Sequence, residues 1–217
     1  MQKTSYQVKS LNIGKIETHT YGKRSFESAI GKQSIKGPVF LGKRGLQGDE
    51  QAFKDHGGED KALCLYPYDY YSYWNGIFTR MEEVALFGEN ITVVGLTEQE
   101  AHIGDVFSFG GAVIQVSEPR NPCYKLAAKY EVPDLVVRMR DTGYTGFLFR
   151  VLEEGNVSQQ DNLVLLEPHA EQVPVSLVND VKFFDKINKE KLEKVLAVDA
   201  LSSSLRSSLL KQYSSKK

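Results

Sequence analysis

Short strand-like segments separated by turn signals are the feature that most limits the folds open to this chain. From Val8 to about Pro168, apolar and polar residues alternate in stretches such as 112–117 and 147–151, and residues 162–166 form a compact apolar run. Gly110-Gly111 predicts a two-residue hairpin just before the first of these strands. Because the strands do not alternate regularly with helices, they favour a closed or nearly closed β-barrel.

Helical segments interrupt these strands. The aromatic-rich stretch from Pro67 to Phe78 begins with a proline, which suits the first turn of a helix. Residues 124–130 and 133–139 also have the pattern of two short helices. The predicted fold class is therefore mainly β with α insertions.

The character of the chain changes after Pro174. Apolar residues there recur at helical spacing on three successive faces, and Asn188 and Ser202 are candidate N-caps. We therefore predict a β-barrel domain over residues 1–170 and a three-helix domain over residues 171–217. A unit of this size has little independent stability, so we expect it to pack on the barrel or on a partner.

Composition excludes several classes of protein. The 217 residues carry a net charge of −1, which gives no general attraction to nucleic-acid polymers or to anionic membranes. Two cysteines do not make a disulfide framework, and the polar start of the chain does not match a signal peptide. No apolar run approaches membrane-spanning length. The expected protein is cytoplasmic, with reduced thiols.

A proline-braced loop presents one cysteine between two cations. It runs from Pro119 to Lys125 with the sequence Pro-Arg-Asn-Pro-Cys-Tyr-Lys. Prolines fix φ and remove backbone donors, so we expect a stiff, extended loop. Arg120, Lys125 and the dipole of the helix predicted to follow favour the thiolate of Cys123. Because a thiolate is a nucleophile or a soft-metal ligand, Cys123 is a candidate active-site residue.

A second polar stretch lies between residues 45 and 61. Gly57-Gly58 permits positive φ, and consecutive amides there would cradle an anion. His56 and the neighbouring carboxylates would alternatively bind a metal, although their spacing matches no recognised ligand pattern. A polar turn with capping aspartates is the commoner use of such residues. His56 is also the base that would activate Cys123 in a cysteine hydrolase, but no local catalytic signature accompanies it.

Three further side chains are candidates for ligand binding. Ser28 and Lys32 offer a hydroxyl and an ammonium suited to a phosphate, although such pairs are also routine on protein surfaces. Asn90 would hydrogen-bond the edge of a heterocycle or simply close a turn. The second cysteine, Cys64, lies inside an apolar run and is predicted to be a buried core residue.

Several short motifs follow one another along the chain in a fixed order. They are Ser28-Ala29-Ile30, Gly45-Leu46-Gln47-Gly48-Asp49-Glu50-Gln51, His56-Gly57-Gly58 with Asp60 and Ala62, Phe87-Gly88-Glu89-Asn90, Ile103-Gly104-Asp105, and Gln115-Val116-Ser117 leading into residues 119–126. With this combination the chain resembles the MOSC domain proteins, specifically the YiiM-type bacterial members. The resemblance covers nearly the whole chain, because those proteins also end in a short three-helix domain.

The resemblance implies a MOSC-type β-barrel followed by a small C-terminal three-helix domain. It also implies binding of the molybdenum cofactor, a molybdopterin with one phosphate, with Cys123 as molybdenum ligand. His56 is the second residue predicted to be catalytic. The implied cofactor-binding residues are Ser28, Lys32, Gly48, Asp49, Gly57, Gly58, Asn90, Arg120, Asn121 and Lys125. Relatives reduce N-hydroxylated substrates, including hydroxylamino purine bases, to amines. The expected reaction is a two-electron reduction in which Mo(IV) removes oxygen from the N–OH group.

Two departures from the family shape the expected partners. The chain lacks the aminotransferase-like domain of full molybdenum cofactor sulfurases, so we do not expect it to mobilise sulfur alone. It carries no ferredoxin-type cysteine cluster, so a separate flavin or iron–sulfur electron donor is implied. The alternative function is a non-enzymatic carrier of the cofactor or of a persulfide on Cys123. A third hypothesis is a binding module whose C-terminal helices dock a partner or form a homodimer.

Overall fold

A nine-stranded sheet forms the centre of the computed structural model, which describes residues 4–53 and 57–214 apart from the side chain of Arg24. All neighbouring strands of this sheet pair antiparallel except β8 and β9, which are parallel. The order across the sheet is β1 (Ser5–Tyr6), β14 (Leu163–Glu167), β10 (Val106–Phe109), β11 (Ala112–Pro119), β12 (Phe147–Glu153), β8 (Leu63–Pro67), β9 (Ile91–Val93), β2 (Val8–Ile13) and β5 (Gln33–Ser34).

The sheet curls on itself without closing into a ring. Strands β1 and β2 are separated by Gln7 alone, yet β1 pairs with β14 near one edge and β2 pairs with β9 near the other. The N-terminal segment 5–13 therefore pairs with strands near both edges of the sheet. Within the described residues no continuous ladder of hydrogen bonds closes the sheet, so the predicted barrel is present as a curled, open sheet.

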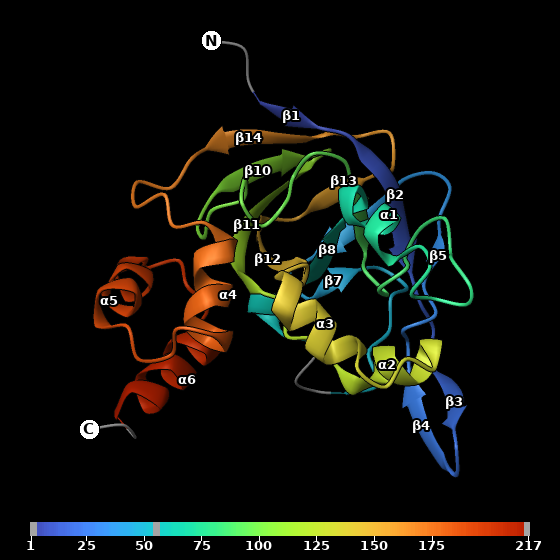
Figure 1. Ribbon diagram of the computed structural model, residues 1–217. Coiled ribbons are helices and arrows are strands. Elements are labelled where there is room, and N and C mark those ends of the chain that lie inside the picture. Colours follow the sequence, from blue (N-terminus) through green and yellow to red (C-terminus); the bar gives the residue numbers. More distant parts are fainter. Residues whose placement is uncertain (1–3, 54–56, 215–217) are drawn as a thin grey trace.

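Two smaller sheets accompany the large one. One contains β13 (Gly155–Val157), β6 (Val39–Gly42) and β7 (Gly45–Leu46). The other is a hairpin of β3 (Glu17–Tyr21) and β4 (Arg24–Ser28), which projects from the lower right of the molecule in Figure 1. The hairpin predicted at Gly110-Gly111 is confirmed, and Gly110 has a φ of 54° in the turn between β10 and β11.

The helical insertions agree with the sequence in two cases of three. Helices α2 (Tyr124–Tyr130) and α3 (Leu135–Thr142) confirm the two short helices predicted after the cysteine loop. The long helix predicted from Pro67 to Phe78 is wrong. Pro67 ends strand β8, and a 3-10 turn leads into the one-turn helix α1 (Tyr71–Trp74). The helix stops because Asn75 is extended and Gly76 has a φ of 96°.

Three helices follow Pro174 as predicted: α4 (Val175–Phe183), α5 (Lys189–Ala197) and α6 (Ser203–Ser214). Asn188 accepts from the Lys191 N–H and Ser202 from the Leu205 N–H, which confirms both N-caps. The buried apolar residues of these helices belong to the same core as those of the sheet, and Figure 1 shows the helices beside it. Their status as a separate domain stays a prediction. No helix in the described ranges has the length and apolar character needed to cross a membrane.

Candidate active site

A pocket beside the cysteine loop gathers side chains from segments that lie far apart in the sequence. Its empty space, including the open mouth, is about 970 Å³. The lining residues are Ser28, Ala29, Ile30, Lys32, Glu50, Gln51, Ala52, Phe53, Lys61, Cys64, Gly88, Asn90, Glu118, Pro119, Arg120, Asn121, Cys123, Lys125 and Leu148. Six of the ten predicted cofactor-binding residues lie in this wall, together with Cys123.

The cysteine loop is held at both ends. Strand β11 ends at Pro119, and the next residue, Arg120, donates its N–H to the Gly146 carbonyl at 3.0 Å. Cys123 has extended backbone and directly precedes α2, where its carbonyl accepts from the Leu126 N–H at 3.0 Å. The thiol is partly buried and free of any disulfide. The loop therefore presents Cys123 to the pocket from a fixed backbone.

The guanidinium of Arg120 is only partly satisfied. Its Nη2 donates to the Phe87 carbonyl at 2.6 Å. Its Nη1 is buried and has no hydrogen-bond partner among the described residues. A buried donor without an acceptor is costly, and an anion in the pocket would supply the missing acceptor.

Lys125 adds a second positive charge to the wall. The residue is 8% exposed, and its Nζ donates to the Glu27 carbonyl at 2.7 Å. The same Nζ lies 5.7 Å from the centroid of the Phe26 ring and 5.9 Å from that of Phe53. These contacts solvate the ammonium without cancelling its charge, which remains to attract an anion.

Asp49 supports the wall from behind. It accepts from the Gly14 N–H at 2.7 Å and from Asn90 Nδ2 at 2.8 Å, and it forms an ion pair with Lys32. Asp49 does not line the pocket, nor does Gly48, whose φ of 88° lets the chain turn there. Asp49 is thus linked to the pocket through Lys32 and Asn90.

The sequence-based prediction for Cys64 is wrong. This residue was predicted to be a buried core residue, but it is partly exposed and lines the same pocket as Cys123. The strand alternates, so the buried side chains of Leu63 and Leu65 take the core face and Cys64 takes the other. That alternation was the signal that would have located it. Burial raises the pKa of the Cys64 thiol, and the charges of Arg120 and Lys32 oppose the rise.

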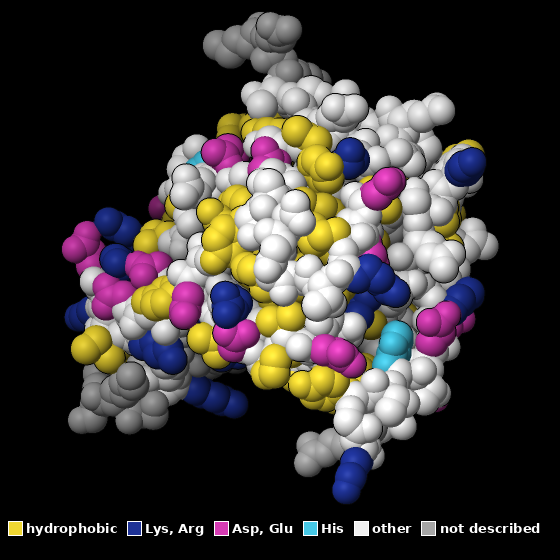
Figure 2. All heavy atoms as spheres, turned by 45° about the vertical axis from the view of Figure 1, so that its right-hand side comes forward, with side chains coloured by type: hydrophobic (Ala, Val, Ile, Leu, Met, Phe, Trp, Pro, Cys, Tyr) yellow, Lys and Arg dark blue, Asp and Glu magenta, His cyan; other side chains and the backbone are white. Residues whose placement is uncertain are grey.

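The pocket wall also contains charged residues that were not among the predicted binding residues. Lys61 and Glu118 form an ion pair at 3.4 Å, and Glu118 is 5% exposed. Glu50 binds the N–H of Ile16 and the Lys15 ammonium, and these hydrogen bonds lower the pKa of its carboxyl. The mouth thus carries charges of both signs. Figure 2 shows acidic, basic and hydrophobic side chains interspersed on one face of the molecule.

The predicted glycine cradle lies outside the pocket wall. Neither Gly57 nor Gly58 lines the pocket; Gly58 has a φ of 119° and accepts from the Lys61 N–H at 2.9 Å. The pair therefore begins the 3-10 turn Glu59–Lys61, which carries Lys61 to the wall. His56 lies outside the described residues. Among those described, no three His, Cys, Asp or Glu side chains are grouped so as to hold a metal ion.

The pocket fits an anionic cofactor that brings its own sulfur ligands. Such a group needs one further soft ligand from the protein, which the sulfur of Cys123 offers, and donors for its phosphate. The unpartnered Arg120 Nη1 and the Lys125 ammonium are such donors. The residues present therefore match the donor set of a molybdopterin cofactor.

Comparisons with known proteins point to one family. Residues 52–164 match the MOSC domain family. The uncharacterized protein YflK of Bacillus subtilis (strain 168) is 45% identical over 213 residues, which are 98% of this chain and 96% of that protein. The crystal structure of YiiM from Geobacillus stearothermophilus has a TM-score of 0.82 at 36% identity, covering 96% of this chain and 99% of that chain.

A third relative is much longer than this chain. It is a protein of Gibberella moniliformis (strain M3125 / FGSC 7600) named Reductase, 38% identical over 144 residues, which are 64% of this chain but 26% of that protein. The matching region of the fungal protein thus adjoins a larger stretch with no counterpart here. Taken with the fold and the pocket, these similarities show that the chain belongs to the MOSC domain family and to its YiiM type.

Proposed function

We propose that this protein is a molybdenum-cofactor-dependent reductase that converts N-hydroxylated compounds, such as hydroxylamino purine bases, to amines. The observation that carries the proposal is that Cys123 and Arg120, whose buried Nη1 has no hydrogen-bond partner among the described residues, line one pocket. A soft ligand and a buried donor for an anion are the two features that this cofactor requires of a protein.

Each side chain of the pocket then has a task. Cys123 would ligate molybdenum, and Arg120 and Lys125 would hold the cofactor phosphate. Asn90 and Lys32, both braced by Asp49, would orient the pterin. The bound cofactor would supply the two electrons of the overall reaction, R–NHOH + 2 e⁻ + 2 H⁺ → R–NH₂ + H₂O.

The substrate would enter over an apolar part of the rim. Phe53 lines the pocket with 49% of its surface exposed, and Ile30 and Leu148 add further apolar surface. A flat aromatic side chain at the mouth suits a planar purine base, because rings stack favourably on one another. This part of the rim would orient the base, so that its N–OH group faces the interior.

Electrons would come from a separate flavin or iron–sulfur protein. The fungal relative named Reductase supports this, because its matching region is joined to a longer stretch of chain. We propose that the additional sequence supplies electrons in the fungal protein, and that a separate protein supplies them to this chain. The cytoplasmic location and a homodimer through the C-terminal helices stay predictions.

The test is metal and pterin analysis of the protein purified from a host that makes the cofactor, with Cys123→Ala beside it. In the parent protein we expect stoichiometric molybdenum and pterin, and reduction of 6-hydroxylaminopurine with a chemical reductant. In Cys123→Ala we expect the bound cofactor and the activity to be lost. Retained activity in Cys123→Ala would exclude the ligand role. Labile sulfur on Cys123 by mass spectrometry, without turnover, would instead support the carrier function.

A further inference from the structure

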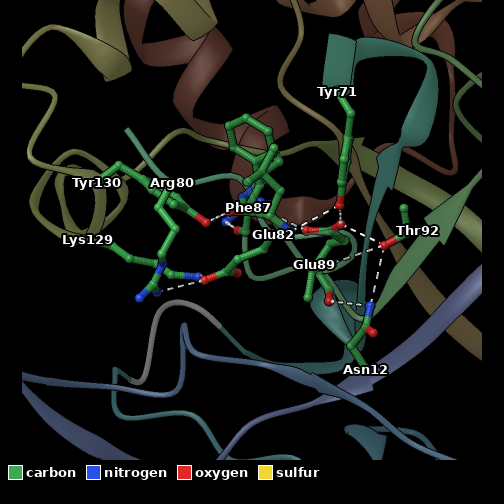
Figure 3. A network of polar contacts seen from close by, with 12 residues as sticks. Asn12, Tyr71, Arg80, Glu82, Phe87, Glu89, Thr92, Lys129 and Tyr130 are labelled. Atoms are coloured by element: carbon green, nitrogen blue, oxygen red, sulfur yellow. Dashed lines mark hydrogen bonds and ion pairs between the residues drawn. The ribbon is translucent and has the colours of Figure 1, made fainter. Parts of the chain in front are cut away.

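The wall of the pocket at Phe87 and Gly88 belongs to a turn that a buried carboxylate organises. Glu89 is fully buried, and its Oε1 accepts from the Tyr71 hydroxyl at 2.5 Å and from the Thr92 hydroxyl at 2.7 Å. Its Oε2 accepts from the Phe87 N–H at 2.9 Å. Figure 3 shows Tyr71 and Thr92 directed at this carboxylate from different sides. The acceptor-only carboxylate satisfies all three donors.

The same network satisfies three consecutive backbone N–H groups of the turn. The Leu86 N–H donates to the Tyr71 hydroxyl at 3.0 Å, and the Ala85 N–H donates to the Thr92 hydroxyl at 3.4 Å. The Phe87 N–H donates to Glu89 itself. The turn needs this support, because Ala85 has a φ of 56°, a conformation unfavourable for a residue with a side chain. Buried N–H groups without acceptors would add a further penalty.

The opposite side of the turn faces the pocket. The Phe87 carbonyl accepts from Arg120 Nη2 at 2.6 Å, and this bond ties one end of the guanidinium to the turn. With Nη2 held there, the unpartnered Nη1 is the group left for a ligand. Gly88 lines the pocket, and a Cβ at that position would lie 2.9 Å from the Ile30 carbonyl oxygen. The turn is therefore closely packed between the network and the pocket, so a shift on one side displaces the other.

We propose that Glu89 is a positioning residue for anion binding: through Tyr71, Thr92 and the turn it fixes the Phe87 carbonyl, which holds Arg120 with Nη1 available to an anionic ligand. The proposal rests on the proposed function for the identity of that ligand, the cofactor phosphate. The positioning itself can be measured with inorganic phosphate and the protein freed of cofactor, so the two ideas fail separately.

The decisive variant is Glu89→Gln, which keeps the size of the side chain. Whichever way its amide turns, an NH₂ group faces either the Phe87 N–H or the two hydroxyls, so a donor loses its acceptor. We expect affinity for inorganic phosphate, measured by calorimetry, to fall about tenfold, with a matching loss of pterin and molybdenum in the purified holoprotein. Tyr71→Phe removes one donor to Glu89 and should give a smaller loss in the same direction, which provides a test if Glu89→Gln folds poorly.

The control is Asp105→Asn, which alters another buried carboxylate that does not line the pocket. Asp105 accepts from the N–H groups of His102 and His169, and its exposure is 2%. We expect this variant to melt at a lower temperature with unchanged phosphate affinity. If Asp105→Asn lost as much affinity for phosphate as Glu89→Gln, general destabilisation would explain both losses, and the proposal would be overturned.

A double-mutant cycle with Arg120→Gln tests whether Glu89 acts through the arginine. If it does, Glu89→Gln should weaken phosphate binding about tenfold in the parent but have almost no effect when Arg120 is already replaced. Independent effects that multiply would overturn the positioning role, as would a parent protein that does not bind phosphate. A parent that binds phosphate with the expected coupling but holds no molybdenum or pterin would refute the proposed function and leave the positioning role standing.

Discussion

The two cysteines of this chain line one pocket but are held in opposite ways. Cys64 lies on strand β8, where its N–H donates to Asn90 Oδ1 at 3.1 Å and its carbonyl accepts from the Asn90 N–H at 2.8 Å. Cys123 lies on a loop that carries two prolines and is anchored by the residues around it. One thiol is part of the rigid sheet, whereas the other extends from a loop beside the cations.

The difference shows that two side chains of the same type in one pocket can have different roles, one in the wall and one in ligand binding. A thiol on a strand is fixed by the ladder around it and cannot approach a ligand without moving the sheet. A thiol on a braced loop can be aimed at a bound group, and loops on a rigid scaffold carry much of the function in proteins for that reason. This difference supports the proposal that Cys123, and not Cys64, ligates molybdenum, while both cysteines line the pocket.

The largest effect should separate the two thiols directly. Cys123→Ser is expected to lower molybdenum retention by at least about 100-fold, because a hydroxyl is a poor soft-metal ligand. Cys64→Ser should retain molybdenum within a few-fold of the parent. The measurement is metal and pterin content per protein, with melting temperature as the control for folding. Equal losses in the two variants would break the comparison, since both thiols would then have to contact the cofactor.

The second prediction concerns a support that only the Cys123 loop has. Glu98 Oε1 accepts from the Thr145 N–H at 2.8 Å and from the Gly146 N–H at 2.6 Å. The Gly146 carbonyl in turn accepts from the Arg120 N–H. Burial raises the pKa of Glu98 from 4.5 to about 7. Between pH 4.5 and about pH 7, Glu98 keeps its proton in the folded protein but has lost it in the unfolded chain. The free energy of unfolding must therefore fall as the pH rises through this range.

Across that window the free energy of unfolding should fall by about 3 kcal/mol through Glu98 alone. Urea unfolding at pH 5, 6, 7 and 8 measures it, with Glu98→Gln expected to flatten the curve by that amount. The control is Glu167→Gln, which removes an exposed carboxyl on β14. It should leave the pH dependence of the unfolding free energy unchanged. Parallel curves for Glu98→Gln and the parent would show that burial does not hold this carboxyl in its protonated form.

Local patterns in the sequence predicted the parts of the site that local physics determines. The limits of α2, the hairpin at Gly110-Gly111 and the position of Cys123 just before a helix all depend on neighbouring residues, and they are confirmed. The same reasoning failed for the stretch 67–78, because the backbone at Asn75 and Gly76 ends the helix despite its aromatic periodicity.

The assembly of the pocket depends on contacts between distant segments, which local patterns do not reveal. Asn90 meets Cys64 because β8 and β9 pair in parallel, an arrangement that no motif near either residue indicates. Asp49 was predicted to bind the cofactor, but it lies behind the wall, where it supports Lys32 and Asn90. Several of the family motifs supply residues of the pocket wall, and the fold decides which of their side chains line it.

The third prediction uses the rate of alkylation. Because burial raises the pKa of Cys64, little thiolate is present there at neutral pH, and the thiolate is the form that reacts. Iodoacetamide should therefore label Cys64 several-fold more slowly in the folded protein than in urea at pH 7.5. Peptide mass spectrometry assigns the label to each cysteine, and Cys64→Ala confirms the assignment. Fast labelling of Cys64 would mean that its thiol is as accessible and reactive as that of an unfolded chain.

The smallest effect should be on stability. Cys64→Ala removes one sulfur from a strand whose backbone contacts with Asn90 remain, so we expect a loss of about 1 kcal/mol in the free energy of unfolding. Asn90→Ala is the informative counterpart, because it also removes the acceptor for the Cys64 N–H and the donor to Asp49. It should therefore destabilise more than Cys64→Ala in urea unfolding at the same pH. The reverse order would mean that packing of the thiol, and not the Asn90 side chain, fixes this strand beside the pocket.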